Sequence, residues 1–301
     1  NNMASKFAKV VGRPTWQQAM LRIADPKKSI PFYTEKMGMT VIDTLDFPQW
    51  SFKLFFLTTL PKGEEYKLTP GTKEAHDYMW SIEGTALELT HNYGTEKDDF
   101  KGYHPGNQEK DGFGHVAFNT DDVYAACEKL EAAGVTFKKK PDEGRMKGLA
   151  FAYDPDGYWV EIVKRATPGK IPNYFNFSQT MLRIKDPKKS IPFYEAMGMT
   201  VVRAKDYGDF SNYFLASSSN VEEGVEYTSL SNDDSKEKLS DMFGPILELT
   251  HNHGTEDDDD FKHYSGNEEG REGFGHIGFL VDDVYKACDG IREMGYGFKK
   301  E

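Results

Sequence analysis

Four polar side chains stand in segments whose neighbours are apolar: Gln18, Glu88, His115 and Glu161. In an extended strand, side chains alternate between two faces. In "LELTHN" (87–92) the glutamate therefore points away from its two leucines. A lone carboxylate on a buried strand is costly unless it is paired or binds a cation. One amide oxygen, two carboxylates and one imidazole together neutralise a divalent cation and leave coordination positions for water or substrate.

Each of these residues taken alone also fits an exposed strand face or a hydrogen-bonded core position. Mixed nitrogen and oxygen ligation suits Zn²⁺, Ni²⁺, Co²⁺ or Mn²⁺, and the residue types do not choose among these metals. His91 and His251 lie on the leucine face of their strands, so we expect structural roles for them. The acidic runs "EKDDF" (96–100) and "EDDDDF" (256–261) are expected to be solvated loops.

The chain is a tandem repeat. "MLRIADPKKSIPFYTEKMGMTV" (20–41) returns as "MLRIKDPKKSIPFYEAMGMTV" (181–201), and "GFGHVAFNTDDVYAAC" (112–127) returns as "GFGHIGFLVDDVYKAC" (273–288). A period of this length makes the repeating unit a whole domain. The second repeat supplies Gln179, Glu248 and His276, and it stops at "GYGFKKE" with no counterpart of Glu161.

We expect a first domain over residues 1–165, a linker over 166–173 ("ATPGKIPN") and a second domain over 174–301 without its C-terminal strands. Each repeat alternates strand, helix and several strands. Asp25 and Pro26 predict a helix start that Gly38 can close, and Asp121 or Asp122 heads the next helix. The pattern predicts an α+β fold of four βαβββ modules, the fourth incomplete.

Composition limits the choice of partners. The net charge of −12 over 301 residues argues against a nucleic-acid binder, because phosphate binding needs a basic face. No apolar run is long enough to span a bilayer. Cys127 and Cys288 fall at matching places in the two repeats and are expected to be thiols rather than a disulfide. We therefore expect a cytoplasmic protein, or an organellar one if a transit peptide preceded Asn1.

Five ordered motifs carry a resemblance to a known family: "QAMLRIADPKKSIPFY", "ALELTHNYGTE", "GFGHVAF", "KKKPDEGRMKGLAF" and "DPDGYWVEIV". They resemble glyoxalase I, lactoylglutathione lyase, nearly end to end, in the two-domain fused form. The resemblance implies the vicinal-oxygen-chelate arrangement of paired βαβββ modules, in a monomer with two pseudo-symmetric domains.

In that family the metal ligands are the Gln or His of the first strand, the Glu of "LELTHN", the His of "GFGH" and the Glu of "YWVEI". Each site draws ligands from two domains. The resemblance thus implies one complete site and one site lacking a fourth ligand, so we expect asymmetric sites. The complete site comprises Gln179, Glu248, His115 and Glu161, and the incomplete site comprises Gln18, Glu88 and His276. Zinc is the expected metal, with nickel, cobalt and manganese as alternatives.

The implied reaction isomerises the hemithioacetal of methylglyoxal and glutathione to S-lactoylglutathione. It requires metal-assisted proton transfer through an ene-diolate. Glu161 is the expected base, and Glu248 is a ligand and possible second base.

Family positions also imply the substrate contacts. Arg183 and Asn252 are expected to bind the γ-glutamyl end of glutathione, and Arg22 and Asn92 do so in the other site. The glycine end is expected to contact Lys139, Arg145 and Met146. One departure stands out: family members often carry an Arg where this chain has Asp111 and Glu272.

Two alternatives remain at this point. A non-catalytic glutathione-conjugate binding protein on the same fold is disfavoured by the carboxylate of Glu161, which a binder does not need. A non-haem iron dioxygenase is disfavoured by Gln179 in the first ligand position, since that chemistry usually uses two His and one Glu.

Overall fold

The first repeat folds as two βαβββ modules. The structure, a computed structural model, describes residues 14–61, 63–171, 174–217 and 220–300. The first module comprises β1 (Thr15–Ile23), α2 (Pro26–Pro31), β2 (Thr40–Phe47), β3 (Phe52–Thr58), an inserted α3 (Lys73–Met79) and β4 (Ala86–Asn92). The second comprises β5 (Phe113–Thr120), α4 (Val123–Ala132), β6 (Phe137–Lys139), β7 (Ala150–Tyr153) and β8 (Trp159–Lys164).

The second repeat begins in the same way. The third module comprises β9 (Asn176–Arg183), α5 (Pro187–Ala196), β10 (Met199–Asp206), β11 (Phe210–Ser217), an inserted α6 (Asn232–Ser240) and β12 (Ile246–Asn252). The fourth contributes β13 (Phe274–Leu280) and α7 (Val284–Glu293). The expected α+β class is confirmed. Of the expected linker, residues 172–173 lie outside the described residues, and the domain boundaries remain a prediction. No helix in the described ranges has the length and apolar character that a bilayer crossing requires.

Helix starts follow from their capping residues. The side chain of Asp25 accepts a hydrogen bond from the amide of Lys27, and that of Asp122 accepts one from Ala125. Asp122, rather than Asp121, is therefore the cap of α4. Gly38 closes its helix with a φ of 70°, a conformation that favours glycine.

The first repeat has one more residue in its first helix than the second repeat has. A π-helical turn over Phe32–Lys36 absorbs it, with the amide of Met37 donating to the carbonyl of Phe32 at 3.1 Å. The shorter second repeat forms the regular helix α5. A single inserted residue is commonly accommodated in this way.

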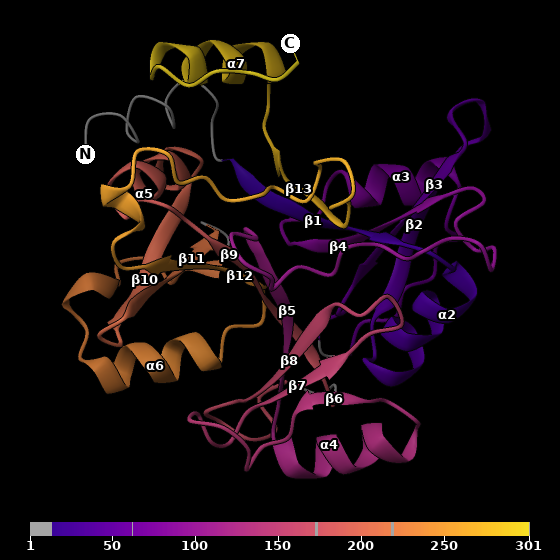
Figure 1. Ribbon diagram of the computed structural model, residues 1–301, viewed down its shortest axis with the longest axis horizontal. Coiled ribbons are helices and arrows are strands. Elements are labelled where there is room, and N and C mark those ends of the chain that lie inside the picture. The colour runs from indigo at the N-terminus through magenta and orange to yellow at the C-terminus, as the bar shows by residue number, and fades with distance from the viewer. Residues whose placement is uncertain (1–13, 62, 172–173, 218–219, 301) are drawn as a thin grey trace.

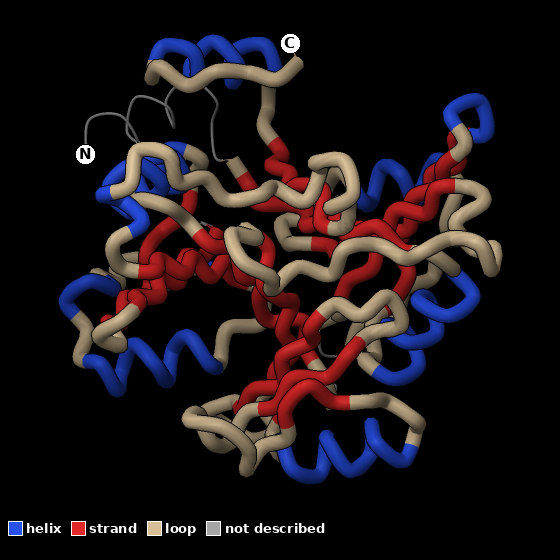
Figure 2. Tube along the Cα trace, in the orientation of Figure 1, coloured by secondary structure: helices blue, strands red, loops and turns tan. Residues whose placement is uncertain are grey.

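The two sheets cross the repeat boundary. An eight-stranded sheet has the order β10-β11-β12-β9-β5-β8-β7-β6, and a five-stranded sheet has the order β13-β1-β4-β3-β2 (Figure 1). Figure 2 shows the strands in red in the same orientation. The joining pairs, β5 with β9 and β1 with β13, are both antiparallel. Modules two and three thus share one sheet, and modules one and four share the other.

The period-two alternation separates a core face from a polar face, as the sequence predicts. Val160 and Ile162 are buried in the main core, which lies between the modules of the first repeat. Glu161 between them faces the opposite side of the sheet, where a cavity lies. Leu247 and Leu249 are buried in a second core in the same way and flank Glu248, which lines that cavity too.

An ion-pair cluster that we call the inter-repeat clip joins the loops before β5 and β13. Its members are Asp111, His104 and Arg271. The buried carboxylate of Asp111 accepts from Nε2 of His104 at 2.7 Å and from Nη1 of Arg271 at 2.9 Å. Beside it, backbone bonds of 2.8 Å join Gly112 and Lys110 to Tyr264. The clip therefore fixes the two repeats to each other.

We expect Arg271→Met to destabilise the protein by about 1–3 kcal/mol, because it removes a charged donor from a buried carboxylate. The free energy of unfolding in urea measures the loss. The matched control is Glu272→Gln at the neighbouring exposed position, where a change within about 0.5 kcal/mol is expected. Equal effects of the two substitutions would contradict a stabilising clip.

Candidate metal centre

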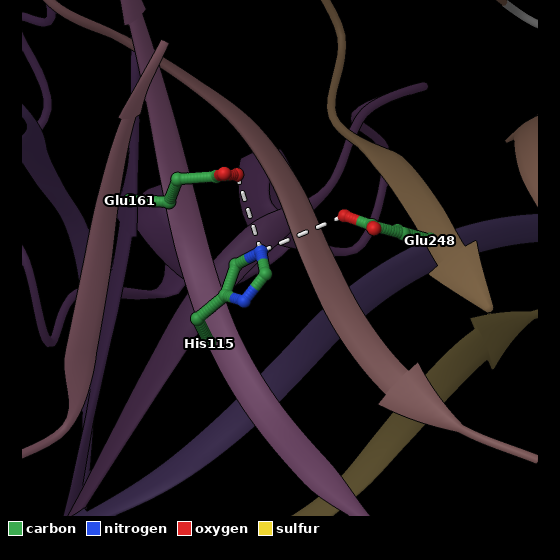
Figure 3. Close-up of side chains that lie close together, drawn as sticks. All are labelled: His115, Glu161 and Glu248. Atoms are coloured by element: carbon green, nitrogen blue, oxygen red, sulfur yellow. Dashed lines mark ion pairs between the residues drawn. The ribbon is translucent and has the colours of Figure 1, made fainter. Parts of the chain in front are cut away.

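Four side chains from four neighbouring strands of the large sheet converge in the cavity. His115 comes from β5, Glu161 from β8, Gln179 from β9 and Glu248 from β12. Nε2 of His115 lies 3.2 Å from Oε2 of Glu161 and 3.5 Å from Oε2 of Glu248. In Figure 3 the two carboxylates approach this nitrogen from different sides. Nε2 of Gln179 donates to both carboxylates, at 2.8 Å each.

The charges of this cluster fit a bound cation. His115, Glu161 and Glu248 each offer a ligand atom, all within 4.8 Å of one another, and all three residues are buried. Nε2 of His115 forms no hydrogen bond with any described residue, although ion-pair distances separate it from both carboxylates. A divalent cation would neutralise the two carboxylates and take this nitrogen as a ligand.

The electrostatics of the metal-free cluster agree with this interpretation. Burial disfavours the imidazolium, but the charges of Glu161 and Glu248 outweigh it and raise the pKa of His115 to about 9. Burial also raises the pKa of Glu248, against the lowering effect of His115. A cation bound at His115 would compete with the proton that this raised pKa favours.

Asn212 of β11 holds one of the carboxylates in place. Its Nδ2 donates to Oε1 of Glu248 at 2.6 Å, and its Oδ1 accepts from the hydroxyl of Thr250 at 3.0 Å. Both oxygens of Glu248 are therefore hydrogen-bonded. The strand register puts Asn212 opposite Thr250 and, in the other sheet, Leu54 opposite Thr90. The first repeat thus has a leucine where the second has this asparagine.

The cavity beside the cluster has a volume of about 500 Å³. Of the predicted glutathione contacts, Arg183, Asn252 and Met146 line it, whereas Lys139 and Arg145 do not. Nζ of Lys139 donates to the carbonyl of Leu149 at 2.6 Å. The sequence interpretation missed several lining residues, since nothing local marks them: Lys147, Asn119, Ser178, Arg203, Tyr207, Asn212 and Lys236.

Arg183 is held rigidly. Its guanidinium donates to the carbonyl of Phe113 at 3.0 Å, to that of Asp111 at 3.3 Å and to Oδ1 of Asn107 at 2.8 Å. Desolvation lowers its pKa, with partial compensation by Asp111 and Glu248. Neither residue at the position where the family often has an Arg lies in the cavity lining. In the first repeat the Asp111 side chain belongs to the inter-repeat clip, and in the second repeat Glu272 is exposed.

A second, smaller cluster lies in the five-stranded sheet. Nε2 of Gln18 donates to Oε2 of Glu88 and lies 3.1 Å from Nε2 of His276, which is 3.5 Å from the same carboxylate. The side chain of His276 is 49% exposed, against 6% for His115. No second carboxylate joins this cluster among the described residues.

The remaining predicted residues of this half also have protein partners. Nη2 of Arg22 donates to Oδ1 of Asn267 at 2.8 Å, and Nδ2 of Asn92 donates to the hydroxyl of Tyr103 at 2.8 Å. His91 and His251 pair with Glu96 and Glu256 at 2.9 and 2.7 Å. Both histidines thus hold the turns that follow their strands, in agreement with the expected structural role.

Comparison with known proteins gives a consistent result. Residues 15–162 and 176–301 match the model of the Glyoxalase/Bleomycin resistance protein/Dioxygenase superfamily. The chain is 40% identical over 287 residues to the lactoylglutathione lyase of Schizosaccharomyces pombe, covering 94% of this chain and 86% of that protein. It is 39% identical over 291 residues to glyoxalase I of Saccharomyces cerevisiae, covering 93% and 81% of the two chains.

The fold is shared with a solved structure as well. The crystal structure of glyoxalase I from Zea mays is similar with a TM-score of 0.61 and 27% identity. The match covers 93% of this chain and 79% of that chain.

We expect Asn212→Leu, which introduces the residue found at this place in the other repeat, to weaken zinc binding. Loss of a partner that orients a metal-binding carboxylate typically costs 10- to 100-fold in metal affinity, so a decrease of at least about 10-fold is expected. Competition with a chromophoric chelator at fixed pH measures it. Asn252→Leu is the matched control, because Asn252 lines the same cavity but, among the described residues, its side chain makes no hydrogen bond to Glu248. Equal affinities for both variants would show that Asn212 does not position Glu248.

Proposed function

The chain belongs to the Glyoxalase/Bleomycin resistance protein/Dioxygenase superfamily, in its two-domain lactoylglutathione lyase (glyoxalase I) form, and we propose which residues carry its reaction. The lyase isomerises the methylglyoxal–glutathione hemithioacetal to S-lactoylglutathione. The complete centre is His115, Glu161, Gln179 and Glu248. The observation that carries this proposal is the convergence of two buried carboxylates on one buried imidazole inside a cavity.

Zinc is the metal that we propose for this centre. Nε2 of His115, the two carboxylates and the amide oxygen of Gln179, once that amide turns its oxygen in place of the Nε2 that now contacts the carboxylates, would form a mixed donor set. Zinc, nickel, cobalt and manganese all accept such a set. When bound, a divalent cation stabilises the negative charge that develops on the substrate oxygens.

The two carboxylates differ in how many of their oxygens accept hydrogen bonds, and this difference suggests different roles. Both oxygens of Glu248 accept hydrogen bonds, from Gln179 and Asn212. Glu161 accepts from Gln179 through Oε2, and no described residue donates to its Oε1. We therefore assign Glu161 as the base whose Oε1 takes the proton from the sulfur-bearing carbon and returns it to the adjacent carbon. Glu248 holds its position as a ligand.

Fixed cations and amides orient the substrate. Arg183 and Asn252 line the cavity and suit the charged γ-glutamyl end of glutathione. Near Met146, the lining cation is Lys147 rather than Lys139 or Arg145, so Lys147 is the group that we propose for the glycine carboxylate. Arg22 and Asn92 occupy the matching places in the incomplete cluster.

One chain supplies all four residues of the centre, so we propose that a monomer is sufficient. The large sheet already joins the two modules that carry them. We propose a reducing compartment such as the cytoplasm. The reaction consumes reduced glutathione, and both cysteines are free.

Glu161→Gln is expected to reduce the rate of S-lactoylglutathione formation by at least about 100-fold, because the amide cannot accept the carbon proton. Initial rates are measured with methylglyoxal and glutathione, before chelation, after chelation, and after zinc or nickel is added back. Chelation should abolish the activity of the unmodified protein, and a metal should restore it.

The matched control is Glu88→Gln in the incomplete cluster, which should leave the rate unchanged. Metal content is measured in both variants, so that loss of the base is separated from loss of the metal. A Glu161→Gln variant with full activity would contradict the assignment of Glu161 as the base. An unmodified protein that stays inactive when loaded with metal would contradict the lyase function itself.

A further inference from the structure

Two buried side-chain oxygens at the α6 end of the cavity have no hydrogen-bond partner among the residues that the structure describes. Asn119 of β5 is 2% exposed and Ser178 of β9 is 8% exposed, and both line the cavity. Oδ1 of Asn119 and Oγ of Ser178 have no hydrogen-bond partner among the described residues. The amide of Asn119 is oriented by a long bond of 3.4 Å from its Nδ2 to the carbonyl of Ser240. Both oxygens are thus buried and unpaired, and the residues that carry them line the cavity.

The strand register locates these groups relative to the metal centre. Ala117 lies opposite both Gln179 and Glu161, and Asn119 lies opposite Val163, two residues further along β8. At about 3.3 Å per residue, Asn119 is roughly 7 Å beyond the level of Glu161. Arg183 lies in the other direction, two residues past Met181, which pairs with His115. The metal centre thus separates Arg183 from the Asn119 and Ser178 pair.

Apolar side chains line part of the cavity that contains the pair. The cavity lining includes the apolar Val163, Phe214, Leu239 and Ile246, together with Lys164, Lys236 and Ser240 of the same elements. In an apolar surrounding, an unpaired polar group costs free energy unless a ligand or water satisfies it. A substrate substituent that enters here must either pair with these two groups or leave them unpaired.

The pair belongs to the complete centre alone. The repeat places Leu280 of β13 where β5 has Asn119, and Gln17 of β1 where β9 has Ser178. The side chain of Gln17 is already used within the protein, in a bond of 3.5 Å to the carbonyl of Met79. The polar pair is thus a property of this cavity and not of the repeated fold.

We propose that this cavity selects α-oxoaldehydes whose side chain carries a hydroxyl group over those with a bare alkyl group. The proposal rests on the lyase function and on the placement of glutathione at Arg183. With glutathione at that end, the aldehyde-derived substituent points toward Asn119 and Ser178. A substrate hydroxyl donates to Oδ1 of Asn119 and accepts from Oγ of Ser178. The isomerisation is unchanged: the proton moves from the sulfur-bearing carbon to its neighbour, without oxidant or reductant.

A site with a buried polar group rejects a substrate that leaves this group unpaired. Since an unpaired group costs about 1–3 kcal/mol, the hydroxylated substrate should be preferred by roughly 5- to 150-fold. The probes are hydroxypyruvaldehyde and methylglyoxal, which differ by one hydroxyl, each with glutathione. The quantity to measure is kcat/KM, expressed per concentration of hemithioacetal, because the two aldehydes form the adduct to different extents.

Asn119→Leu, which introduces the residue found in the other repeat, should bring the ratio of the two kcat/KM values close to one. Ser178→Ala should lower this ratio to a value between that of the unmodified protein and one. The reciprocal control, Leu280→Asn in the incomplete half, should leave the ratio of the unmodified protein in place. A ratio near one in the unmodified protein, or a ratio that Asn119→Leu does not change, would overturn the proposal. Inactivity toward both aldehydes would instead contradict the lyase function on which the proposal rests.

Discussion

Two carboxylates buried beside a single imidazole are the constraint on which this structure depends. Glu161 and Glu248 face Nε2 of His115 inside the large sheet, and one amide donor, Gln179, serves both of them. Burying this excess of negative charge is unfavourable without a cation. The four side chains come from strands of both repeats. The antiparallel pair β5–β9 that joins the repeats is therefore also the element that assembles the centre.

The same constraint explains why the two halves differ. Gln18, Glu88 and His276 also meet, but β13 is the edge strand of its sheet in the described chain, so no neighbour presents a second carboxylate. His276 is consequently half exposed. With one carboxylate instead of two, this cluster carries less uncompensated charge. Sequence similarity between the repeats thus coexists with one buried centre and one open cluster.

How much was predictable from sequence depended on the range of the interaction. Period-two alternation predicted which face of "LELTHN" carries the glutamate, and capping chemistry predicted the starts of α2 and α4. Interactions between segments distant in sequence were not predictable in this way. Asp111 forms an ion pair with Arg271, Asn212 donates to Glu248 from the neighbouring strand, and Lys147 lines the cavity in place of Lys139. These depend on register and loop path, which no local pattern encodes.

Zinc titration of the metal-free protein at neutral pH, with a competing chelator and simultaneous detection of released protons, measures how many complete metal centres the chain holds. We expect one tightly bound ion per chain of residues 1–301. We also expect proton release on binding, since the pKa of His115 is about 9 before the metal enters. His115→Ala should abolish the tight site, and His276→Ala should leave it intact. Two equivalent tight sites, or a tight site that survives His115→Ala, would contradict a single complete centre.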